Sequence, residues 1–374
     1  MDLMPLAQEV GFSFLRFPGG NWGDENDITE LQLDNFITLC EQLGAEPSIS
    51  VRLRGGTPEA AAELVRYANV EKKYNVRYWS IGNEPELFGD YDTERYNQEW
   101  RIFATAMREV DPSILLVGPD VSQYRGNVFT DPRDENMRYW VDEFLRANGD
   151  LVDVVSIHRY PFPRSMVSGP AKILDLEENS MEWDQIIPNL RELIHEETGR
   201  ELPVAVTEFN SHWDSSFRGE GTPDSHYSAI WLGDVLGRLI RQDVEIVAQF
   251  ALQSASDNGG WGLFSRVEPR PSYYVYRMYQ QFGSQLVYAS SGVDSVSVYA
   301  AVRRDGELSV LIINLGLAER RIPLVVNGRS IQQADYWLFD ENHNAEQMSP
   351  LVVESGDAFS LPAQSISVLV FHGH

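Results

Sequence analysis

Over about its first 283 residues, the chain alternates short apolar runs with longer segments of helical periodicity. The apolar runs are rich in Val, Ile and Phe and nearly continuous, which is typical of strands covered on both faces. This alternation of strand and helix predicts parallel β-α units. The predicted strands are Ser13–Phe17, Glu46–Leu53, Arg77–Ile81, Leu115–Gly118, Val152–Ile157, Pro203–Thr207 and Glu245–Ala251. The predicted helices are Leu3–Val10, Ile28–Leu43, Pro58–Tyr74, Glu94–Val110, Glu135–Ala147, Trp183–Thr198, Ser225–Arg241 and Ser272–Phe282.

The pattern predicts an α/β fold, a (β/α)8-type TIM barrel that lacks its first strand. Such a barrel needs eight strands, but seven strand–helix units are visible and only Met1 and Asp2 precede the first helix. The strands Ser13–Phe17 and Glu245–Ala251 would then expose unpaired edges. We expect these two strands to close directly into a seven-stranded barrel, or a second copy of the chain to cover the gap in a homo-oligomer. An open doubly wound sheet is the alternative fold.

Beyond about residue 284, the periodicity changes from helical to alternating. Apolar and polar residues alternate along short runs, and turn sequences such as Asp305-Gly306 and Asn327-Gly328 separate these runs. We therefore expect a barrel domain over residues 1–283 and an antiparallel β-sandwich over residues 284–374. The predicted strands of the sandwich are Val293–Val302, Leu308–Leu315, Arg321–Val326, Gln333–Phe339 and Ser365–Phe371.

Composition and charge narrow the classes of partner. The formal net charge of −26 over 374 residues disfavours nucleic acid and anionic membranes, and no apolar run approaches the length of a membrane span. With Cys40 as the one cysteine, no internal disulfide is expected. The seven histidines lack metal-ligand spacing, so we expect neither metal nor cofactor. No signal peptide is visible. We therefore expect a cytoplasmic protein, or a secreted protein if the chain has been trimmed.

Two segments carry the strongest chemical signal. Trp79–Glu86 (WSIGNEPE) and Val204–Asn210 (VAVTEFN) each place a glutamate just past an apolar strand. The carboxyl ends of parallel barrel strands meet at one rim, where active sites lie, so we expect Glu84 and Glu208 to face each other there. Two opposed carboxylates are the machinery of glycoside hydrolysis. The alternative is a pair of surface glutamates, and nearby Glu86 is expected to be exposed and without a role.

The motif Asn83-Glu84-Pro85 resembles clan A of the glycoside hydrolases, the retaining (β/α)8 enzymes. In that clan the acid/base follows an Asn on strand four, and the nucleophile ends strand seven. The resemblance extends over about residues 12–283. It implies that Glu84 is the acid/base, that Glu208 is the nucleophile, and that Asn83 bonds the sugar 2-hydroxyl.

Three segments resemble different families within the clan. Thr207–Asn210 is similar to β-xylosidases. Arg16–Gly20 resembles arabinofuranosidases, which have Met where this chain has Pro85, and Gly82–Phe88 resembles the β-glucuronidase and heparanase family. We expect a retaining hydrolase of β-linked plant glycans, xylan or β-glucan, acting on an oligo- or polysaccharide. An α-L-arabinofuranosidase or β-glucuronidase is the alternative, and a non-catalytic carbohydrate-binding protein on a degenerate barrel is the alternative of another class.

The remaining candidates lie at or just beyond strand ends. Arg16 is expected to bond the nucleophile and keep it ionised, Tyr160 to bond the nucleophile, and His158 to touch the sugar or the acid/base. Tryptophans in loops suit the apolar faces of sugars, and polar side chains near the last strand are placed to reach hydroxyls. Each has a structural alternative, such as a salt bridge or core packing. The further substrate-binding candidates are Asn21, Trp213, Trp261 and Gln249.

Overall fold

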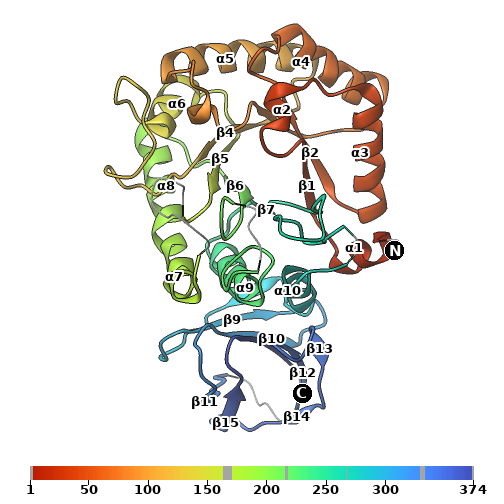
Figure 1. Cartoon of the computed structure of the whole chain (residues 1–374), viewed down its shortest axis with the longest axis vertical. Helices are drawn as coiled ribbons and strands as arrows, with labels where there is room; N and C mark the ends of the chain where they lie inside the picture. The colour runs from red at the N-terminus through yellow and green to blue at the C-terminus, as the bar shows by residue number, and fades with distance from the viewer. Residues whose placement is uncertain (1–2, 163–170, 215–217, 267, 329–332, 373–374) are drawn as a thin grey trace.

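A computed structural model describes residues 3–162, 171–214, 218–266, 268–328 and 333–372 of the chain. Within them, seven parallel strands form one sheet in sequence order, which curls into a nearly closed barrel ringed by helices (Figure 1). The α/β barrel prediction is therefore confirmed. The strands are β1 (Phe14–Phe17), β2 (Glu46–Val51), β3 (Tyr78–Ile81), β4 (Leu115–Ser122), β5 (Val154–Arg159), β6 (Val204–Phe209) and β7 (Ile246–Gln249).

Helix boundaries follow from local capping chemistry. The Thr29 hydroxyl accepts a hydrogen bond from the Gln32 amide at the start of one helix, and Gly44 ends that helix with left-handed backbone. Asp92 caps another helix in the same way. The helices are α1 (Met4–Val10), α2 (Trp22–Glu25), α3 (Glu30–Leu43), α4 (Pro58–Val65), η1 (Arg66–Glu71), η2 (Pro85–Leu87), α5 (Thr93–Val110), α6 (Trp140–Asn148), α7 (Ile173–Asn179), η3 (Ser180–Glu182), α8 (Trp183–Thr198), α9 (His226–Arg241) and α10 (Pro271–Tyr279).

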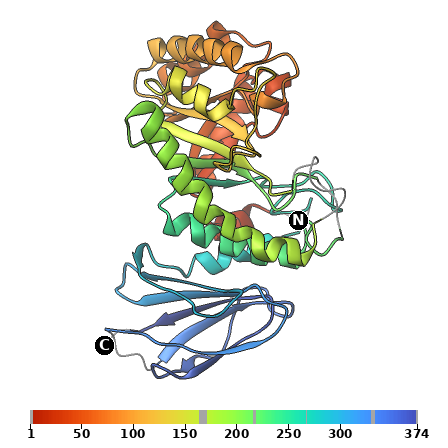
Figure 2. The ribbon, with the colours of Figure 1, turned by 90° about the vertical axis from the view of Figure 1, so that its left-hand side faces the viewer.

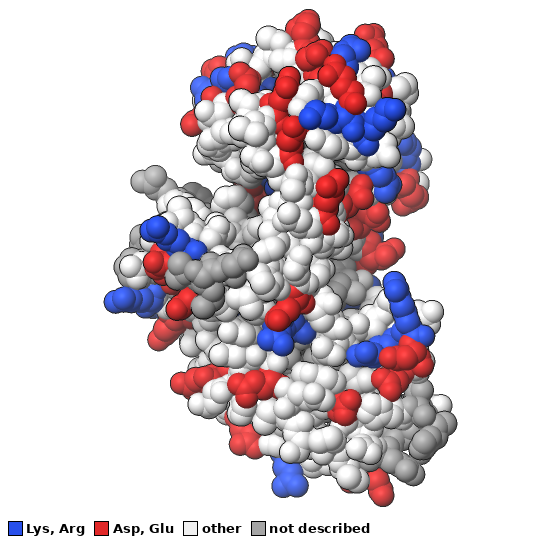
Figure 3. Space-filling view, turned by 90° about the vertical axis from the view of Figure 1, so that its right-hand side faces the viewer, with Lys and Arg blue, Asp and Glu red and all other residues white. Residues whose placement is uncertain are grey.

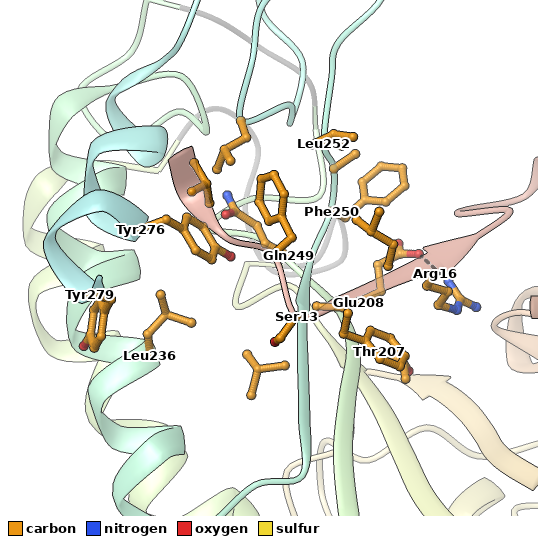
Figure 4. A pocket seen from close by; sticks show the side chains of 18 of the residues that line it. Ser13, Arg16, Thr207, Glu208, Leu236, Gln249, Phe250, Leu252, Tyr276 and Tyr279 are labelled. Carbon is orange, nitrogen blue, oxygen red and sulfur yellow. Dashed lines mark hydrogen bonds and ion pairs between the residues drawn. The ribbon is translucent and has the colours of Figure 1, made fainter. Parts of the chain in front are cut away.

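The barrel is open between its first and last strands. β1 and β7 are the two ends of the sheet and do not pair with each other in the described part of the chain. A cavity of about 510 Å³ lies beside them, lined by Phe14, Val247 and Gln249 of the two strands and by Leu236 and Tyr276 of α9 and α10 (Figure 4). From residue 3 onward, the described chain has helix α1 and no strand before β1, which agrees with the predicted strand count. Direct closure of the seven strands is not what the structure shows, and closure by a second copy stays a prediction.

The C-terminal region is antiparallel, as predicted. Its larger sheet has the order β13-β12-β16-β10-β9-β8, with β14 paired to β12, and β11 and β15 form a second, two-stranded sheet. Apolar side chains of both sheets share one core, which makes a β-sandwich. The strands are β8 (Gln285–Val287), β9 (Val296–Val302), β10 (Leu308–Asn314), β11 (Arg320–Pro323), β12 (Gln333–Phe339), β13 (Glu346–Gln347), β14 (Leu351–Val352), β15 (Ala358–Leu361) and β16 (Ser365–Phe371).

α9 and α10 lie between the barrel and the sandwich (Figures 1 and 2). The Tyr227 hydroxyl of α9 donates to the Leu315 carbonyl at 2.8 Å, and the Tyr299 hydroxyl of β9 donates to Asp234 of α9 at 2.6 Å. Leu311 and Ile313 of β10 also join the hydrophobic core of the barrel. The sandwich therefore packs on the barrel through a continuous apolar interface.

Figure 3 gives the arrangement of charged side chains on one face of the molecule. On the face shown in Figure 3, acidic and basic side chains are interspersed. Among the helices of the described residues, none combines the length and apolar character that a bilayer crossing requires.

Candidate active site

Glu208 is the fifth residue of β6, at the carboxyl end of the strand, and is only 4% exposed. Three donors converge on its carboxylate. Tyr160 donates to Oε1 at 2.7 Å, while Arg16 Nη1 and the Gly20 amide donate to Oε2 at 3.2 and 3.3 Å. Figure 4 shows the pair of Glu208 and Arg16 at the rim of the open side. Among the described residues, three donors and no acceptor therefore face this carboxylate, an arrangement that suits a group acting through its oxygen lone pairs.

Tyr160 is suited to remain a donor. Burial raises the pKa of its hydroxyl well above the usual range, and the negative charges of Glu208 and Glu84 raise it further. The phenol therefore keeps its proton at neutral pH. The predicted contact between Tyr160 and the candidate nucleophile is present in the structure.

Glu84 follows β3 in an uncommon backbone conformation. Its φ is +45°, in the left-handed region that few glutamates adopt. The Glu84 amide donates to the Asp120 carbonyl at 3.2 Å, and its Oε1 lies 3.1 Å from His158 Nδ1. Strain of this kind persists where surrounding structure fixes it, often at functional sites. Here it turns the chain sharply as it leaves the strand.

The two glutamates face each other closely. One ligand atom each from Glu84, His158 and Glu208 lies within 4.8 Å of the others. Retaining glycosidases hold their two carboxyl groups about 5–5.5 Å apart, whereas inverting enzymes need about 6.5–9.5 Å to admit a water. The spacing suits a retaining reaction. The same three side chains are near enough for a metal ion, and the hydrogen bond between His158 and Glu84 also accounts for part of their closeness.

Asp120, on β4, is a buried residue that the sequence analysis missed. Its carboxylate accepts hydrogen bonds from Arg16 at 3.2 Å and from the hydroxyls of Ser156 and Thr207. Burial opposes ionisation, but the charges of Arg16 and His158 and the two hydroxyls outweigh it and lower the pKa of Asp120. It therefore links β1, β4, β5 and β6 beneath the rim. In the sequence, Asp120 follows an apolar run just as Glu84 does, so the same criterion could have identified it.

His158 lies between two acids and is fully buried. Its Nδ1 faces Glu84, and its Nε2 lies 3.7 Å from Asp120. Burial disfavours the imidazolium, but the carboxylates of Glu208, Glu84 and Asp120 outweigh burial and raise the pKa of His158. Of the two contacts predicted for this residue, the structure places it against the candidate acid/base.

Asn83 lies beside Arg16 under the rim. Its Oδ1 accepts from Arg16 Nη2 at 2.9 Å, while its Nδ2 is buried without a protein partner among the described residues. A buried amide donor without a partner is costly, so Nδ2 is available for a ligand. The bond from Asn83 to a sugar 2-hydroxyl stays a prediction.

Above these residues lies a cleft of about 640 Å³ with two different walls. We call the lining residues that follow β1, β5, β6 and β7 the Glu208 wall, and they are mostly aromatic; those at or after the ends of β3 and β4 are the Glu84 wall, and they are mostly polar. Asn21, Trp213 and Trp261 line the cleft as predicted, whereas Gln249 lies on the cavity between β1 and β7 instead. The Glu208 wall contains Gly20, Asn21, Tyr160, Trp213, Phe250 and Trp261, and the Glu84 wall contains Glu86, Leu87, Ser122, Gln123, Pro132 and Arg133.

The expectation that Glu86 is exposed was wrong. Its side chain lines the cleft, its Oε1 accepts from the Ser122 amide at 2.7 Å, and its Oε2 is buried without a protein partner in the described chain. Burial, together with the negative charge of Glu84, raises the pKa of Glu86 to about 8. The short turn η2 directs Leu87 outward, where it is 62% exposed, and Glu86 inward.

No protein-family model matches this chain. Over 220 residues it is 26% identical to an intracellular exo-α-(1→5)-L-arabinofuranosidase of Halalkalibacterium halodurans, covering 47% of this chain and 42% of that protein. Over 157 residues it is 27% identical to a probable α-L-arabinofuranosidase C of Aspergillus terreus, covering 31% of each. The matched region thus spans less than half the length of these curated relatives.

Solved structures extend the likeness over nearly the whole chain. An α-L-arabinofuranosidase of Thermotoga maritima in complex with arabinose has a TM-score of 0.78 and 18% identity, covering 99% of this chain and 89% of that one. A bifunctional glucanase–xylanase from a metagenome library has a TM-score of 0.79 and 18% identity, covering 99% and 94%. The chain has the fold of the clan A glycoside hydrolases, and the resemblance to that clan is confirmed. The two sequence relatives named above are arabinofuranosidases.

Proposed function

We propose that this chain is a retaining glycosidase that releases α-L-arabinofuranosyl units from oligo- or polysaccharides. Relatives named as arabinofuranosidases support this substrate, as does the Arg16–Gly20 segment, which resembles that family. The expectation of xylan or β-glucan gains no specific support, since the glucanase–xylanase neighbour shares the fold alone. The sequence relatives therefore favour the alternative reading over the main one.

One observation carries the proposed reaction: two carboxylates face each other within 4.8 Å and differ in their surroundings. Glu208 accepts three protein donors, which suits an ionised nucleophile. Among the described residues, Glu84 Oε1 pairs with His158, and the Glu84 side chain lines the cleft. A group placed in this way suits proton donation to a substrate.

In the first step, Glu208 attacks the anomeric carbon and forms an ester bond to the sugar. The bond from that carbon to the leaving oxygen breaks with its electron pair, and Glu84 supplies the proton that the oxygen needs. Arg16 and Tyr160 position the attacking carboxylate.

In the second step, the ionised Glu84 takes a proton from water. That water attacks the anomeric carbon, and Glu208 leaves as a free carboxylate. Two inversions give net retention. Glu84 is again protonated, so the cycle closes without an outside acid.

The test is a panel of 4-nitrophenyl glycosides: α-L-arabinofuranoside, β-D-xyloside, β-D-glucoside and β-D-glucuronide. We expect the arabinofuranoside to be cleaved fastest, Glu208→Gln to abolish turnover, and proton NMR to detect the retained anomer first. A faster xyloside or glucuronide would overturn the proposed sugar. Absence of turnover on the whole panel, with arabino-oligosaccharide binding in calorimetry, would favour the non-catalytic carbohydrate-binding protein.

A further inference from the structure

Glu86 is a cleft residue that the proposed mechanism does not use. It lies two residues after Glu84 in the turn η2, and its carboxyl group enters the cleft from the Glu84 side. One oxygen is fixed by the Ser122 amide of β4 at 2.7 Å. The other is buried and has no protein partner in the described chain. A buried polar atom without a partner is unfavourable, and a ligand group that pairs with it is able to offset that cost.

The geometry of the proposed reaction indicates which part of the substrate lies next to Glu86. The nucleophile contacts the sugar that becomes attached to the protein, whereas the acid faces the oxygen of the leaving group. Glu86 shares the wall of Glu84 with Gln123 and Arg133, and the aromatic residues lie on the wall of Glu208. Groups on the Glu84 wall therefore face the leaving group.

The chemical state of Glu86 indicates which partner it takes. Burial is the first cause of its raised pKa and favours the neutral carboxylic acid even while Glu84 holds the proton that the first step requires. With Oε1 accepting from Ser122, the acid proton lies on Oε2 and is available for donation. Sugar hydroxyls accept such a bond, whereas a plain aryl ring offers no matching acceptor.

Resting on the glycosidase function proposed above, we propose that Glu86 is a specificity-determining residue. It donates a hydrogen bond from its carboxyl group to a hydroxyl of the sugar on the leaving-group side. The cleft thereby favours a saccharide leaving group over an apolar one. Sites built to bond a hydroxyl reject analogues that lack it, because a buried group is then left unpaired.

The experiment compares two substrates with the same glycone: (1→5)-linked α-L-arabinobiose and 4-nitrophenyl α-L-arabinofuranoside. The measured quantity is the selectivity ratio, kcat/KM for the disaccharide divided by kcat/KM for the aryl glycoside. Glu86→Ala should lower this ratio about 10–100-fold, chiefly through KM for the disaccharide. Glu86→Gln keeps a donor of similar size and should restore the ratio to within about 3-fold of wild type.

Glu109→Ala, at an exposed glutamate on the outer helix α5, is the matched control. An equal loss on both substrates in Glu86→Ala would overturn the assignment, since it would show that Glu86 acts through Glu84 or the fold. A disaccharide loss in Glu86→Gln as large as in Glu86→Ala would overturn it as well. Failure of the wild-type protein to cleave either substrate would instead refute the arabinofuranosidase proposal. If the panel identifies another glycone, the same pair is made with that sugar.

Discussion

Each wall of the cleft contains a glutamate, but the groups around the two carboxylates differ. On one wall, Glu208 accepts donors from Arg16, Gly20 and Tyr160. On the other, Glu84 meets His158 and lies beside a second carboxyl group, Glu86. Donors stabilise a charge, and a neighbouring acid disfavours one. The proposed roles of nucleophile and acid therefore rest on the different groups around two identical side chains.

One of the donors to Glu208 comes from a strand at the open side of the barrel. Arg16 belongs to β1, an end of the sheet whose four residues are all partly exposed, whereas every residue of β6 is buried. Asp120 holds Arg16 from below, at 3.2 Å. The support of the candidate nucleophile therefore bridges the least buried strand of the barrel and one of its most buried strands.

The largest expected effect tests the Glu208 wall. Glu208→Ala removes the attacking oxygen and should lower kcat at least about 10⁴-fold. Added azide fits the vacated space and should restore turnover, giving a glycosyl azide of inverted configuration, identified by NMR. Substantial residual activity, or an azide product of retained configuration, would refute the assignment of Glu208 as nucleophile.

The next effect tests the Glu84 wall and should depend on the leaving group. Glu84→Ala should lower kcat/KM about 10²–10⁴-fold for alkyl or sugar leaving groups, which need a proton. Dinitrophenyl glycosides leave without that proton and should lose far less in the glycosylation step. Azide should now give the retained product, because Glu208 still forms the intermediate. A loss independent of leaving group would show that Glu84 is not the acid.

A smaller effect tests one donor of Glu208. Tyr160→Phe removes the 2.7 Å hydrogen bond to Oε1, and a bond to a charged group is worth about 1.5–3 kcal/mol. We expect kcat on the aryl arabinofuranoside to fall about 10–100-fold. Tyr67→Phe is the matched control, because the Tyr67 hydroxyl also bonds a carboxylate, that of Asp34 at 3.1 Å, on the outside of the barrel. Equal effects of the two substitutions would remove the special role of the Tyr160 contact.

The sequence was sufficient for features that depend on continuous patterns. The helix Trp183–Thr198 and the strand Gln333–Phe339 were predicted with the bounds that the structure has. Glu84 and Glu208 were identifiable because a carboxylate at the end of an apolar run is conspicuous. Helix α2 was missed because four residues show no periodicity.

Side-chain directions beyond strand ends were not predictable from alternation. The inward direction of Glu86 depends on the left-handed backbone at Glu84. Asp120 lies in an irregular pairing of β4 with β5, where the register shifts between Pro119 and Val121. A one-residue shift sends side chains to the other face. The register of β6 against β7 also shifts before Gln249, which lies on the cavity rather than the cleft.

The last expected effect is on stability rather than on turnover, and it tests whether Glu86 is protonated beside Glu84. The pKa of Glu86 rises from 4.5 to about 8 in the folded chain, through burial first and then the charge of Glu84. Between these values the folded state holds a proton that the unfolded state has released, so stability falls as pH rises through this window. Glu86→Gln cannot ionise and escapes that loss. Its free energy of unfolding, relative to wild type, should therefore rise from pH 5 to pH 8 by up to about 4 kcal/mol and level off above. Urea unfolding at each pH measures it, with Glu109→Gln as the surface control, and a flat or falling difference would mean that Glu86 is ionised beside Glu84 throughout.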